Sequence, residues 1–591
     1  MLSKGIARRF GKLIKLSDYE NTTAKASAKV TGDVLTPRDI ACVARNYQQV
    51  QLGSSERASK GFALIQKMIA DGNRTLYGVH TNYGGHATKG SSSLGTDAID
   101  RQTNLLWALS ADAGNALPRE SVRAALFLRT NSLIQGASGV SWSLIERCET
   151  FLNKRLTPVV KEHGSIGASG DLVPLTMVCG SLIGLAPHFK IEGPDGTVLP
   201  APVALAVNGM DKLKLAPKDA IGFVNGTSFS LGIGSLALYD AVRYYDLALS
   251  IESLICNVMM ANMEAFSGYV AQIRPYNSHK YVSEIFRERL AGSKLTVRTL
   301  DEAVKSKYKT LVQDRYPIRC LPQYMAPLLD KLSSVQEYFE NESVTVSDNP
   351  VLDIKSGEVY HGGNFLATGP TMGCDDIRYS MAIMVKSLDA LIGQLHEPSM
   401  SLELPHSLRA TEDGVAMGLK GPQILLNSIA GKVLYYASPV WPLFSTHSEQ
   451  YNQAVNSLAF QSALMASESC RLTQTYLSVA LMHAIQACEL RTKQIFGSYC
   501  AKEYISPRLI PLYDAYYTVI GKQSSSSKPA FITDYDCAYS VAIEAISKDI
   551  ASPESKIMAA LHKSKATPRT FAHTTSPHDK KTETLVQPTD T

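Results

Sequence analysis

Hydrophobic residues recur with the spacing of an α-helix along most of the chain. Between residues 144 and 152, Leu, Ile, Cys and Phe side chains share one helical face, and the Thr-Pro pair at 157–158 ends the run. Residues 458–493 contain no Gly or Pro and are rich in Ala, Leu, Met and Ser, which predicts one helix of about nine or ten turns. A helix of this length needs packing partners along its side, so the pattern predicts a bundle of long helices.

Strand patterns are few and local. Residues 189–199 surround a Pro-Asp-Gly turn and residues 351–360 surround a Lys-Ser-Gly turn, so each predicts a small β-hairpin. A Gly-x-Gly sequence at 232–234 lies in a helical run with no strand before it, which argues against a dinucleotide-binding loop. The fold class predicted is mostly α, a long-helix bundle with small β-hairpins.

Composition narrows the class of protein. Hydrophobic residues make up 45% and charged residues 19% of 591 positions, which is typical of globular chains. The net charge of +5 is too dilute to indicate a nucleic-acid surface, so a small-molecule partner is favoured. Apolar runs such as residues 174–187 are too short to span a bilayer, and we expect no membrane partner.

The cysteines and histidines give no sign of a metal site or of disulfides. Ten cysteines are spread singly along the chain without a CxxC pair, which favours a reducing, cytoplasmic setting. The histidines lack ligand spacings such as HExxH, so we expect neither a metal nor a nucleotide cofactor.

The two ends of the chain differ from its middle. The first 17 residues carry five basic side chains and no acid, which fits a solvated extension or an amphipathic transit peptide. Residues from 565 on are polar and few of them are apolar, which predicts a disordered tail. We therefore divide the chain into a basic extension (1–30), an N-terminal domain (31–220), a long-helix core with C-terminal helices (221–564) and a tail (565–591).

The segment with the most unusual composition is residues 164–175, GSIGASGDLVPL. Small residues crowd around Ser169, and Gly has no side chain to prevent one peptide nitrogen from approaching a nearby carbonyl carbon, so internal cyclisation is conceivable. The same four letters, GASG, occur at residues 136–139 inside another helical region. Four letters alone are therefore compatible with a simple turn.

The context of residues 164–175 distinguishes the two copies. This segment resembles the signature of the aromatic amino-acid and histidine ammonia-lyases, which build a methylidene-imidazolone (MIO) prosthetic group from their own chain. The resemblance implies that the nitrogen of Gly170 attacks the carbonyl carbon of Ala168, and that dehydration leaves an exocyclic methylene derived from Ser169. No such context surrounds residues 136–139.

Further motifs follow in the order of this family over roughly residues 31–560. The overall pattern is most similar to the shorter bacterial phenylalanine ammonia-lyases. The matching segments are YGVHTNYG (77–84), NGTS (225–228), QDRYPIR (313–319), DNP (348–350), HGGNF (361–365), LKG (419–421) and EQYNQ (449–453).

The resemblance assigns a role to each site residue. Tyr77 removes the β proton of the substrate, and we expect the MIO environment to depress its pKa. Arg319 binds the substrate carboxylate through its guanidinium fork, and Tyr316 is a second catalytic tyrosine. Gln313 and Gln453 are supporting residues, Gln453 by fixing Tyr316 or the MIO ring. The residues implied in substrate binding are Ala108, Leu109, Leu172, Asn225, Arg319, Asn349, Phe365, Lys420 and Glu449, with Asn225 also beside the prosthetic group.

Substrate choice in the family follows a residue pair in the helix after the Tyr loop, here Ala108-Leu109. Phenylalanine enzymes usually have Phe-Leu at these positions, tyrosine enzymes His-Leu and histidine enzymes Ser-His. Leu109 argues against an imidazole substrate, whereas Ala108 leaves space for water or a hydroxylated ring. Tyr83 replaces the usual Phe of the loop, and its hydroxyl needs a partner if buried. A ring hydroxyl of the substrate is one candidate, and a Tyr83 that points elsewhere is the other.

The family resemblance implies non-oxidative deamination of an aromatic L-amino acid, such as phenylalanine, tyrosine or dihydroxyphenylalanine, to the cinnamic-type acid and ammonia. It also implies a homotetramer whose active sites draw on several chains. Three alternatives remain open: an aromatic 2,3-aminomutase, a histidine ammonia-lyase, and an inactive helical scaffold. The scaffold is opposed by the presence of Tyr77, Ser169 and Arg319.

Overall fold

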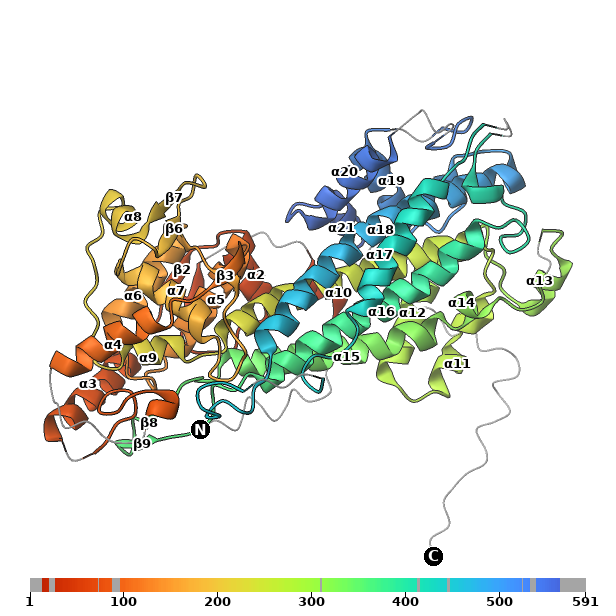
Figure 1. Ribbon diagram of the computed structural model, residues 1–591. Helices are drawn as coiled ribbons and strands as arrows, with labels where there is room; N and C mark the ends of the chain where they lie inside the picture. Colours follow the sequence, from red (N-terminus) through yellow and green to blue (C-terminus); the bar gives the residue numbers. More distant parts are fainter. Residues whose placement is uncertain are drawn as a thin grey trace, which may run out of the picture.

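The computed structural model describes residues 13–20, 27–72, 74–87, 96–308, 311–411, 415–443, 447–522, 525–531 and 538–563. Helices dominate these residues, and Figure 1 shows an elongated molecule with a lobe of shorter helices and small sheets at one end and a long-helix bundle at the other. The mostly α fold predicted from the sequence is confirmed.

Four long helices form the centre of the bundle. They pack against one another along their lengths because their contacting faces are apolar. Helix α18 has 38 residues, and at 1.5 Å per residue it is about 57 Å long. Every residue of α10 except Asp240 is buried. The four are α10 (Ser228–Val258), α15 (Leu321–Ser343), α16 (Thr368–Leu395) and α18 (Ala459–Phe496).

Shorter helices surround this centre. Those before α10 are α2 (Pro37–Arg45), α3 (Glu56–Asp71), α4 (Thr96–Ala108), α5 (Arg119–Leu133), α6 (Trp142–Asn153), α7 (Leu172–Ile183), α8 (Ala201–Val207) and α9 (Asp219–Val224). Those after it are α11 (Gly268–Gln272), α12 (Asn277–Leu290), α13 (Leu300–Lys305), α14 (Tyr316–Arg319), α17 (Lys420–Tyr435), α19 (Ile510–Ile520), α20 (Tyr539–Ala551) and α21 (Lys556–Ala560). The 3₁₀ turns are η1 (Leu16–Tyr19), η2 (Gly84–His86), η3 (Met263–Phe266), η4 (His406–Leu408) and η5 (Ala501–Glu503).

The strands are short and make small separate sheets. Both predicted hairpins are present: β6 (Lys190–Glu192) pairs antiparallel with β7 (Val198–Pro200), and β8 (Val351–Asp353) with β9 (Glu358–Tyr360). Strand β4 (Thr157–Pro158) extends the first hairpin. The remaining pairs are β1 (Ala28–Val30) with β2 (Val50–Leu52), parallel, and β3 (Ala113–Ala116) with β5 (Lys161–His163), antiparallel.

The expected basic extension over residues 1–30 needs a correction where the structure describes it. Ile14 is buried and its backbone N–H donates to Ser333 Oγ at 3.1 Å, while Tyr19 OH donates to Gln336 Oε1 at 2.9 Å. The segment 13–20 thus packs on α15, with Ile14, Leu16 and Tyr19 buried. Residues 1–12 and 21–26, and the tail predicted from residue 565 on, lie outside the described residues.

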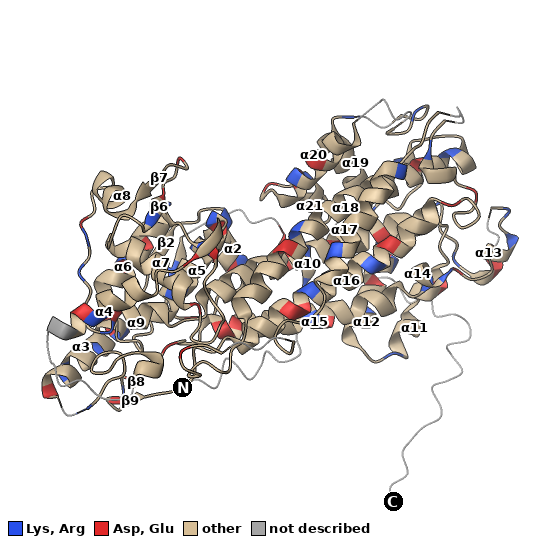
Figure 2. Ribbon diagram, in the orientation of Figure 1, with Lys and Arg blue, Asp and Glu red and all other residues tan. Residues whose placement is uncertain are grey.

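One helical stretch has the composition of a membrane span but lies in the core. Residues Asp219–Val258 are long and apolar enough to cross a bilayer, and the apolar window is fully buried by the rest of the chain. Packing inside the protein accounts for its apolarity. Lys, Arg, Asp and Glu are interspersed on the surrounding helices (Figure 2).

Candidate active site

The turn that contains the Gly-Ala-Ser-Gly run connects β5 to α7. Gly167 and Gly170 have φ of +65° and +66°, a left-handed conformation that side chains disfavour. A Cβ atom on Gly170 would lie 2.3 Å from the carbonyl oxygen of Gly226, so this position has no room for a side chain. The turn therefore has the sharp backbone fold, and the bare Gly, that a ring closure between residues 168 and 170 requires.

The starts of two core helices hold this turn. Ser457 Oγ, just before α18, donates to the carbonyl oxygen of Gly167 at 2.9 Å. Asp171, the residue before α7, is fully buried and accepts hydrogen bonds from the hydroxyl and backbone N–H of Ser230 at 2.7 and 2.9 Å. Ser230 lies in the first turn of α10. The position of Ser169 is thus set by the bundle and not by the loop alone.

Tyr77 lies on the loop between α3 and α4. Its neighbours Leu76 and Val79 are buried in a small apolar cluster with residues of α3 and β8, which anchors the loop on both sides of the phenol. The backbone N–H of Gly84 donates to the Tyr77 oxygen at 2.7 Å. A hydrogen bond to the oxygen favours the phenolate.

Burial and two neighbouring groups act on the pKa of Tyr77 in the single chain. Burial raises the pKa of Tyr77 and Glu449 raises it further, while the Gly84 N–H lowers it. The single chain thus raises the pKa of Tyr77 mainly through burial, and Glu449 is the one charged side chain among the described residues that line the surrounding cavity. The depression that we expect from the MIO environment stays a prediction.

The cavity has a volume of about 390 Å³ and lies between the Tyr loop and the Gly-rich turn. This volume falls in the range of about 300–1,000 Å³ that small-molecule sites occupy. Its apolar side chains are Leu105, Leu109, Leu172, Ile221, Phe365, Leu366 and Val455. Its polar side chains are Tyr77, Tyr83, Ser169, Asn225, Asn349, Glu449, Asn452 and Gln453.

Three of the polar residues surround Ser169. Gln453 Nε2 donates to Ser169 Oγ at 3.1 Å. The Asn225 amide satisfies its neighbours best when its Nδ2 donates to the carbonyl oxygen of Ser169 at 3.0 Å and its Oδ1 accepts from the backbone N–H of Asn349 at 2.9 Å. The residues present therefore fit a prosthetic group formed at residues 168–170, with amide donors on both sides of Ser169.

Helix α4 presents Leu105 and Leu109 to the cavity, one helical turn apart. Ala108 is exposed and does not line the cavity, because it is rotated by about 100° from Leu109 around the helix. The small side chain of Ala108 therefore does not enlarge the cavity, contrary to our expectation. The motifs did not indicate Leu105 as a cavity residue. Its spacing of four residues from Leu109 does, because residues four apart lie on the same face of a helix.

The Tyr83 hydroxyl already has protein partners. It donates to the carbonyl oxygen of Gly78 at 3.0 Å and accepts from Gln102 Nε2 at 3.0 Å. The ring of Tyr83 packs edge-on against the ring of Tyr77, with centroids 6.2 Å apart. The Tyr83 hydroxyl therefore needs no partner from a ring hydroxyl of the substrate. It stabilises the Tyr loop through its contacts with Gly78 and Gln102.

Four predicted site residues lie away from the cavity. Arg319 donates to Gln313 Oε1, and its guanidinium carbon lies 4.7 Å from the centroid of the Tyr316 ring. Tyr316 is 64% exposed, and Lys420 is also exposed. Helix α14, which carries Tyr316 and Arg319, lies at the opposite end of the molecule from α4 and α7 (Figure 1). The structure thus divides the predicted site between two ends of one chain.

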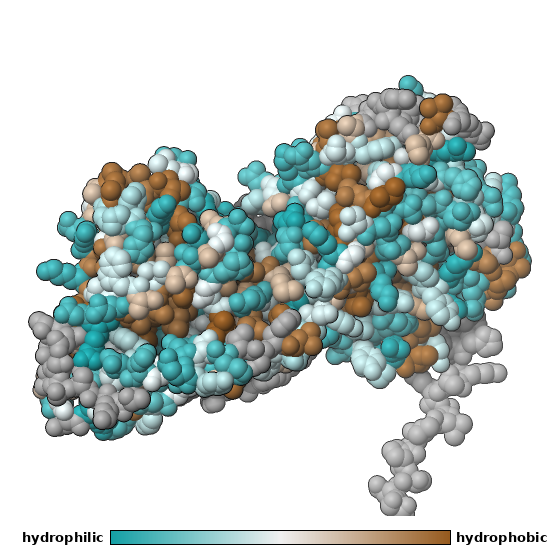
Figure 3. Space-filling model, viewed as in Figure 1, coloured by the Kyte–Doolittle hydropathy of each residue, from teal (hydrophilic) through white to brown (hydrophobic). Residues whose placement is uncertain are grey.

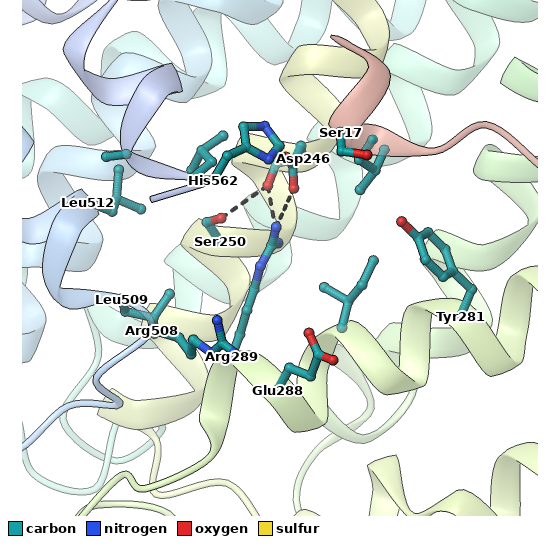
Figure 4. Close-up of a pocket in the computed structure, with 14 residues that line it drawn as sticks. Ser17, Asp246, Ser250, Tyr281, Glu288, Arg289, Arg508, Leu509, Leu512 and His562 are labelled. Atoms are coloured by element: carbon teal, nitrogen blue, oxygen red, sulfur yellow. Dashed lines mark hydrogen bonds and ion pairs between the residues drawn. The ribbon is translucent and has the colours of Figure 1, made fainter. Parts of the chain in front are cut away.

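A second cavity of about 190 Å³ lies between α10, α12 and the segments at residues 16–17 and 560–562 (Figure 4). At its wall Asp246 forms an ion pair with Arg289, and His562 lies 3.3 Å from the other Asp246 oxygen. None of the predicted site residues lines this cavity.

Comparison with known proteins identifies the family of the chain. A family model described as aromatic amino acid lyase matches residues 35–507. The phenylalanine ammonia-lyase of Nostoc punctiforme is 38% identical over 535 residues, 90% of this chain and 94% of its own length. An aromatic ammonia-lyase of Loktanella atrilutea is 34% identical over 531 residues, 88% of this chain and 95% of its own. The solved structure of Pantoea agglomerans phenylalanine aminomutase is similar with a TM-score of 0.80 and 25% identity, covering 90% of this chain and 100% of that chain.

The family resemblance that we inferred from short motifs is therefore confirmed over most of the chain. The solved structure likewise agrees with the mostly helical fold. The chain belongs to the aromatic amino acid lyase family, as an enzyme of its ammonia-lyase group.

Proposed function

We propose that the enzyme eliminates ammonia from phenylalanine in preference to ring-hydroxylated amino acids, giving the cinnamic-type acid. The carrying observation is the cavity that joins Tyr77 and Ser169 with a wall of Leu, Ile and Phe side chains. An apolar wall suits an unsubstituted ring, because a buried hydroxyl without a partner is costly. Leu109 offers no hydrogen bond to an imidazole, which argues against histidine.

The electrophile in this proposal is an MIO group formed from Ala168, Ser169 and Gly170. When present, it supplies an electron-poor methylene that makes the substrate amine a better leaving group. The Gln453 and Asn225 amides, which contact the Ser169 hydroxyl and carbonyl, would hold it. General base catalysis alone, worth about 10² to 10⁴, does not account for removal of a weakly acidic benzylic proton.

Tyr77 accepts the β proton in this mechanism. A phenol is a poor base at neutral pH unless its phenolate is stabilised. In one chain only the Gly84 N–H acts in that direction, against burial and Glu449. A cation brought to the cavity would lower the pKa of Tyr77 and would also bind the substrate carboxylate.

We further propose that this cation is Arg319 from another copy in a homotetramer. None of Arg319, Tyr316, Gln313 and Lys420 lines the cavity, although the family resemblance assigns them to the same site. Helix α14, which carries Tyr316 and Arg319, lies at the other end of the molecule (Figure 1). Helix α17 also exposes large apolar side chains, Ile424 at 63% and Tyr435 at 78%. Hydrophobic surface is visible over the part of the bundle where α17 and α18 lie (Figure 3). Such a surface favours association with a second copy. No disulfide joins the described cysteines, which is compatible with a cytoplasmic enzyme.

The test is ultraviolet detection of the unsaturated acid with phenylalanine, tyrosine, dihydroxyphenylalanine and histidine in parallel. Fastest turnover of phenylalanine supports the proposal. Faster turnover of the hydroxylated rings, or of histidine, contradicts the proposed specificity but not the lyase group. Chiral analysis for a β-amino acid distinguishes an aminomutase. The mass of the peptide spanning residues 168–170 tests the electrophile directly, since MIO formation removes two water molecules.

A further inference from the structure

Behind the cavity lies a fully buried ion pair that the mechanism above does not use. Lys218 Nζ donates to Asp348 Oδ2 at 2.7 Å, and both side chains are 0% exposed. Burying two charges is costly, and replacing such a pair by apolar residues is often neutral or stabilising. A contribution to stability alone therefore does not explain why this pair is present.

The pair is connected to two residues of the cavity wall. Lys218 is the N-cap of the short helix α9, and Asn225 is the C-cap of the same helix. On the other side of the pair, Asp348 Oδ1 accepts from the backbone N–H of Asn349 at 2.7 Å. One buried contact thus ties the helix that presents Asn225 to the segment that presents Asn349.

The contacts continue from these residues to the Gly-rich turn. Asn349 N–H also reaches Asn225 Oδ1 at 2.9 Å, and Asn225 Nδ2 donates to the Ser169 carbonyl oxygen at 3.0 Å. In the opposite amide orientation, Asn225 Nδ2 would instead lie 3.4 Å from Asp348 Oδ1. Asp348 Oδ1 and the Ser169 carbonyl oxygen therefore compete for the Asn225 amide donor, and the ion pair with Lys218 makes the carboxylate the weaker competitor.

A second buried cation holds the same two segments. Arg129 Nε donates to the carbonyl oxygen of Phe223 in α9 at 2.9 Å, and its Nη1 donates to that of Ser347 at 3.0 Å. Arg129 thus joins α9 to the residue before Asp348 mainly through backbone carbonyls, and its Nη1 also donates to Ser347 Oγ at 3.3 Å. The backbone is already braced by Arg129, which leaves the Lys218–Asp348 pair to orient side chains.

We propose that Lys218 and Asp348 are positioning residues for the reaction: their ion pair fixes and neutralises Asp348, so that Asn349 N–H holds Asn225 Oδ1 and Asn225 Nδ2 donates to the Ser169 carbonyl oxygen. This inference rests on the proposed function. A hydrogen bond aimed at that oxygen withdraws electron density from residues 168–170, where the proposed electrophile forms. The pair acts through Asn225 and Asn349 and does not touch the substrate.

The test replaces the pair while avoiding a lone buried charge. Lys218→Met with Asp348→Asn removes both charges and keeps the shape of the Asp348 side chain. Lys218→Gln with Asp348→Asn keeps a neutral hydrogen bond, and is used in the same way should the first double variant not fold. The matched control is Arg289→Met with Asp246→Asn, which removes another largely buried pair, 14% and 4% exposed, at the second cavity (Figure 4).

Three quantities are measured on each protein: Tm, deuterium uptake of the peptide around residue 349, and kcat per site that has lost two water molecules at residues 168–170. We expect the pair variant to keep a cooperative thermal transition, to exchange faster around residue 349, and to lose about tenfold to a hundredfold in kcat, which is less than the roughly 10²- to 10³-fold cost of removing an aligned donor outright. The control pair should leave uptake around residue 349 and kcat unchanged.

A pair variant with wild-type kcat and wild-type uptake would overturn the positioning role. Equal losses of kcat in the pair variant and the control would also overturn it, because the effect would then be one of general stability. If the wild-type protein itself loses no water at residues 168–170 and releases no unsaturated acid, the proposed function fails, which is a different result from either of these.

Discussion

The two ends of this molecule differ in what they lack. At the cavity end, Tyr77, Ser169, Asn225 and Gln453 come together around 390 Å³ of space, but the described lining contains Glu449 and no Lys or Arg. At the far end of the bundle, Arg319 lies against Tyr316, which is 64% exposed, and no described cavity includes Arg319.

This difference explains why the pKa of Tyr77 is unfavourable for a base in the single chain. Burial and Glu449 raise the pKa of Tyr77, whereas a phenol that acts as a base at neutral pH needs positive charge nearby. In the proposed mechanism Arg319, at the other end of the molecule, supplies this charge. A chain that keeps the proposed base and the proposed carboxylate-binding cation apart is then active only as an assembly.

The largest effect is expected from Ser169→Ala at the cavity end. Loss of the hydroxyl removes the source of the methylene, so kcat should fall by about 10³-fold or more, roughly 4 kcal/mol of transition-state stabilisation. The fold should be retained. Steady-state kinetics and the mass of the peptide spanning residues 168–170 measure both consequences.

The chain supplies its own control for this variant. Ser138 belongs to the second GASG run at 136–139, it is fully buried, and its Oγ lacks a hydrogen-bond partner. Ser138→Ala should leave activity and peptide mass unchanged. Near-wild-type turnover of Ser169→Ala would refute the assignment of the electrophile.

At the far end, Arg319→Ala should lower kcat/KM by roughly 10- to 100-fold, the worth of one charge-assisted hydrogen-bonded pair. Arg319→Lys should recover part of the loss, because it restores the charge but not the two-pronged geometry. The comparison is made with phenylalanine at fixed pH. Unchanged kinetics in Arg319→Ala would remove this residue from the site.

Acid should weaken the fold through two buried histidines, His396 directly after α16 and His483 within α18. Burial lowers the pKa of His396 to about 3, with a further contribution from His483, and burial lowers that of His483 to about 4. The unfolded chain binds more protons than the folded one below about pH 6.5, so stability falls as pH falls, by up to about 1.4 kcal/mol per pH unit for each histidine.

Urea unfolding between pH 7 and pH 5 measures this slope. The double variant His396→Gln/His483→Gln should flatten it, whereas His406→Gln, a change at an exposed histidine, should not. An acid slope that is the same in all three proteins would show that these two imidazoles are not responsible.

The smallest effect is expected from Tyr83→Phe. Its hydroxyl is bonded to Gly78 and Gln102, so the variant loosens the Tyr loop without touching the substrate ring. We expect kcat/KM to fall by a factor of about three to ten, and by the same factor for phenylalanine and tyrosine. A selective loss with tyrosine would mean that Tyr83 binds the ring hydroxyl after all.

The sequence predicted the helical bundle and both hairpins because their signals are local. Helix α18 follows from a Gly- and Pro-free stretch, and the hairpins follow from their turn residues. The motifs also indicated residues that meet only in three dimensions, such as Ser169 and Gln453, which are 284 positions apart.

Other features depend on tertiary contacts that no local pattern contains. The exposure of Ala108 follows from the rotation of α4 against the cavity, and the buried Lys218–Asp348 pair joins residues 130 positions apart. Cavity residues such as Ile221 and Val455 are apolar positions like many others in the chain. The direction of the Tyr77 pKa shift depends on which charges surround it, and the sequence does not give their distances.

The most direct test of a site shared between the two ends is complementation. Ser169→Ala and Arg319→Ala chains are each purified, unfolded together and refolded as mixed assemblies, with each variant refolded alone as the control. If one site takes Ser169 from one copy and Arg319 from another, the mixture should recover a clear fraction of wild-type activity that neither variant has alone. Activity of the mixture no greater than the average of the two separate variants would contradict the shared site.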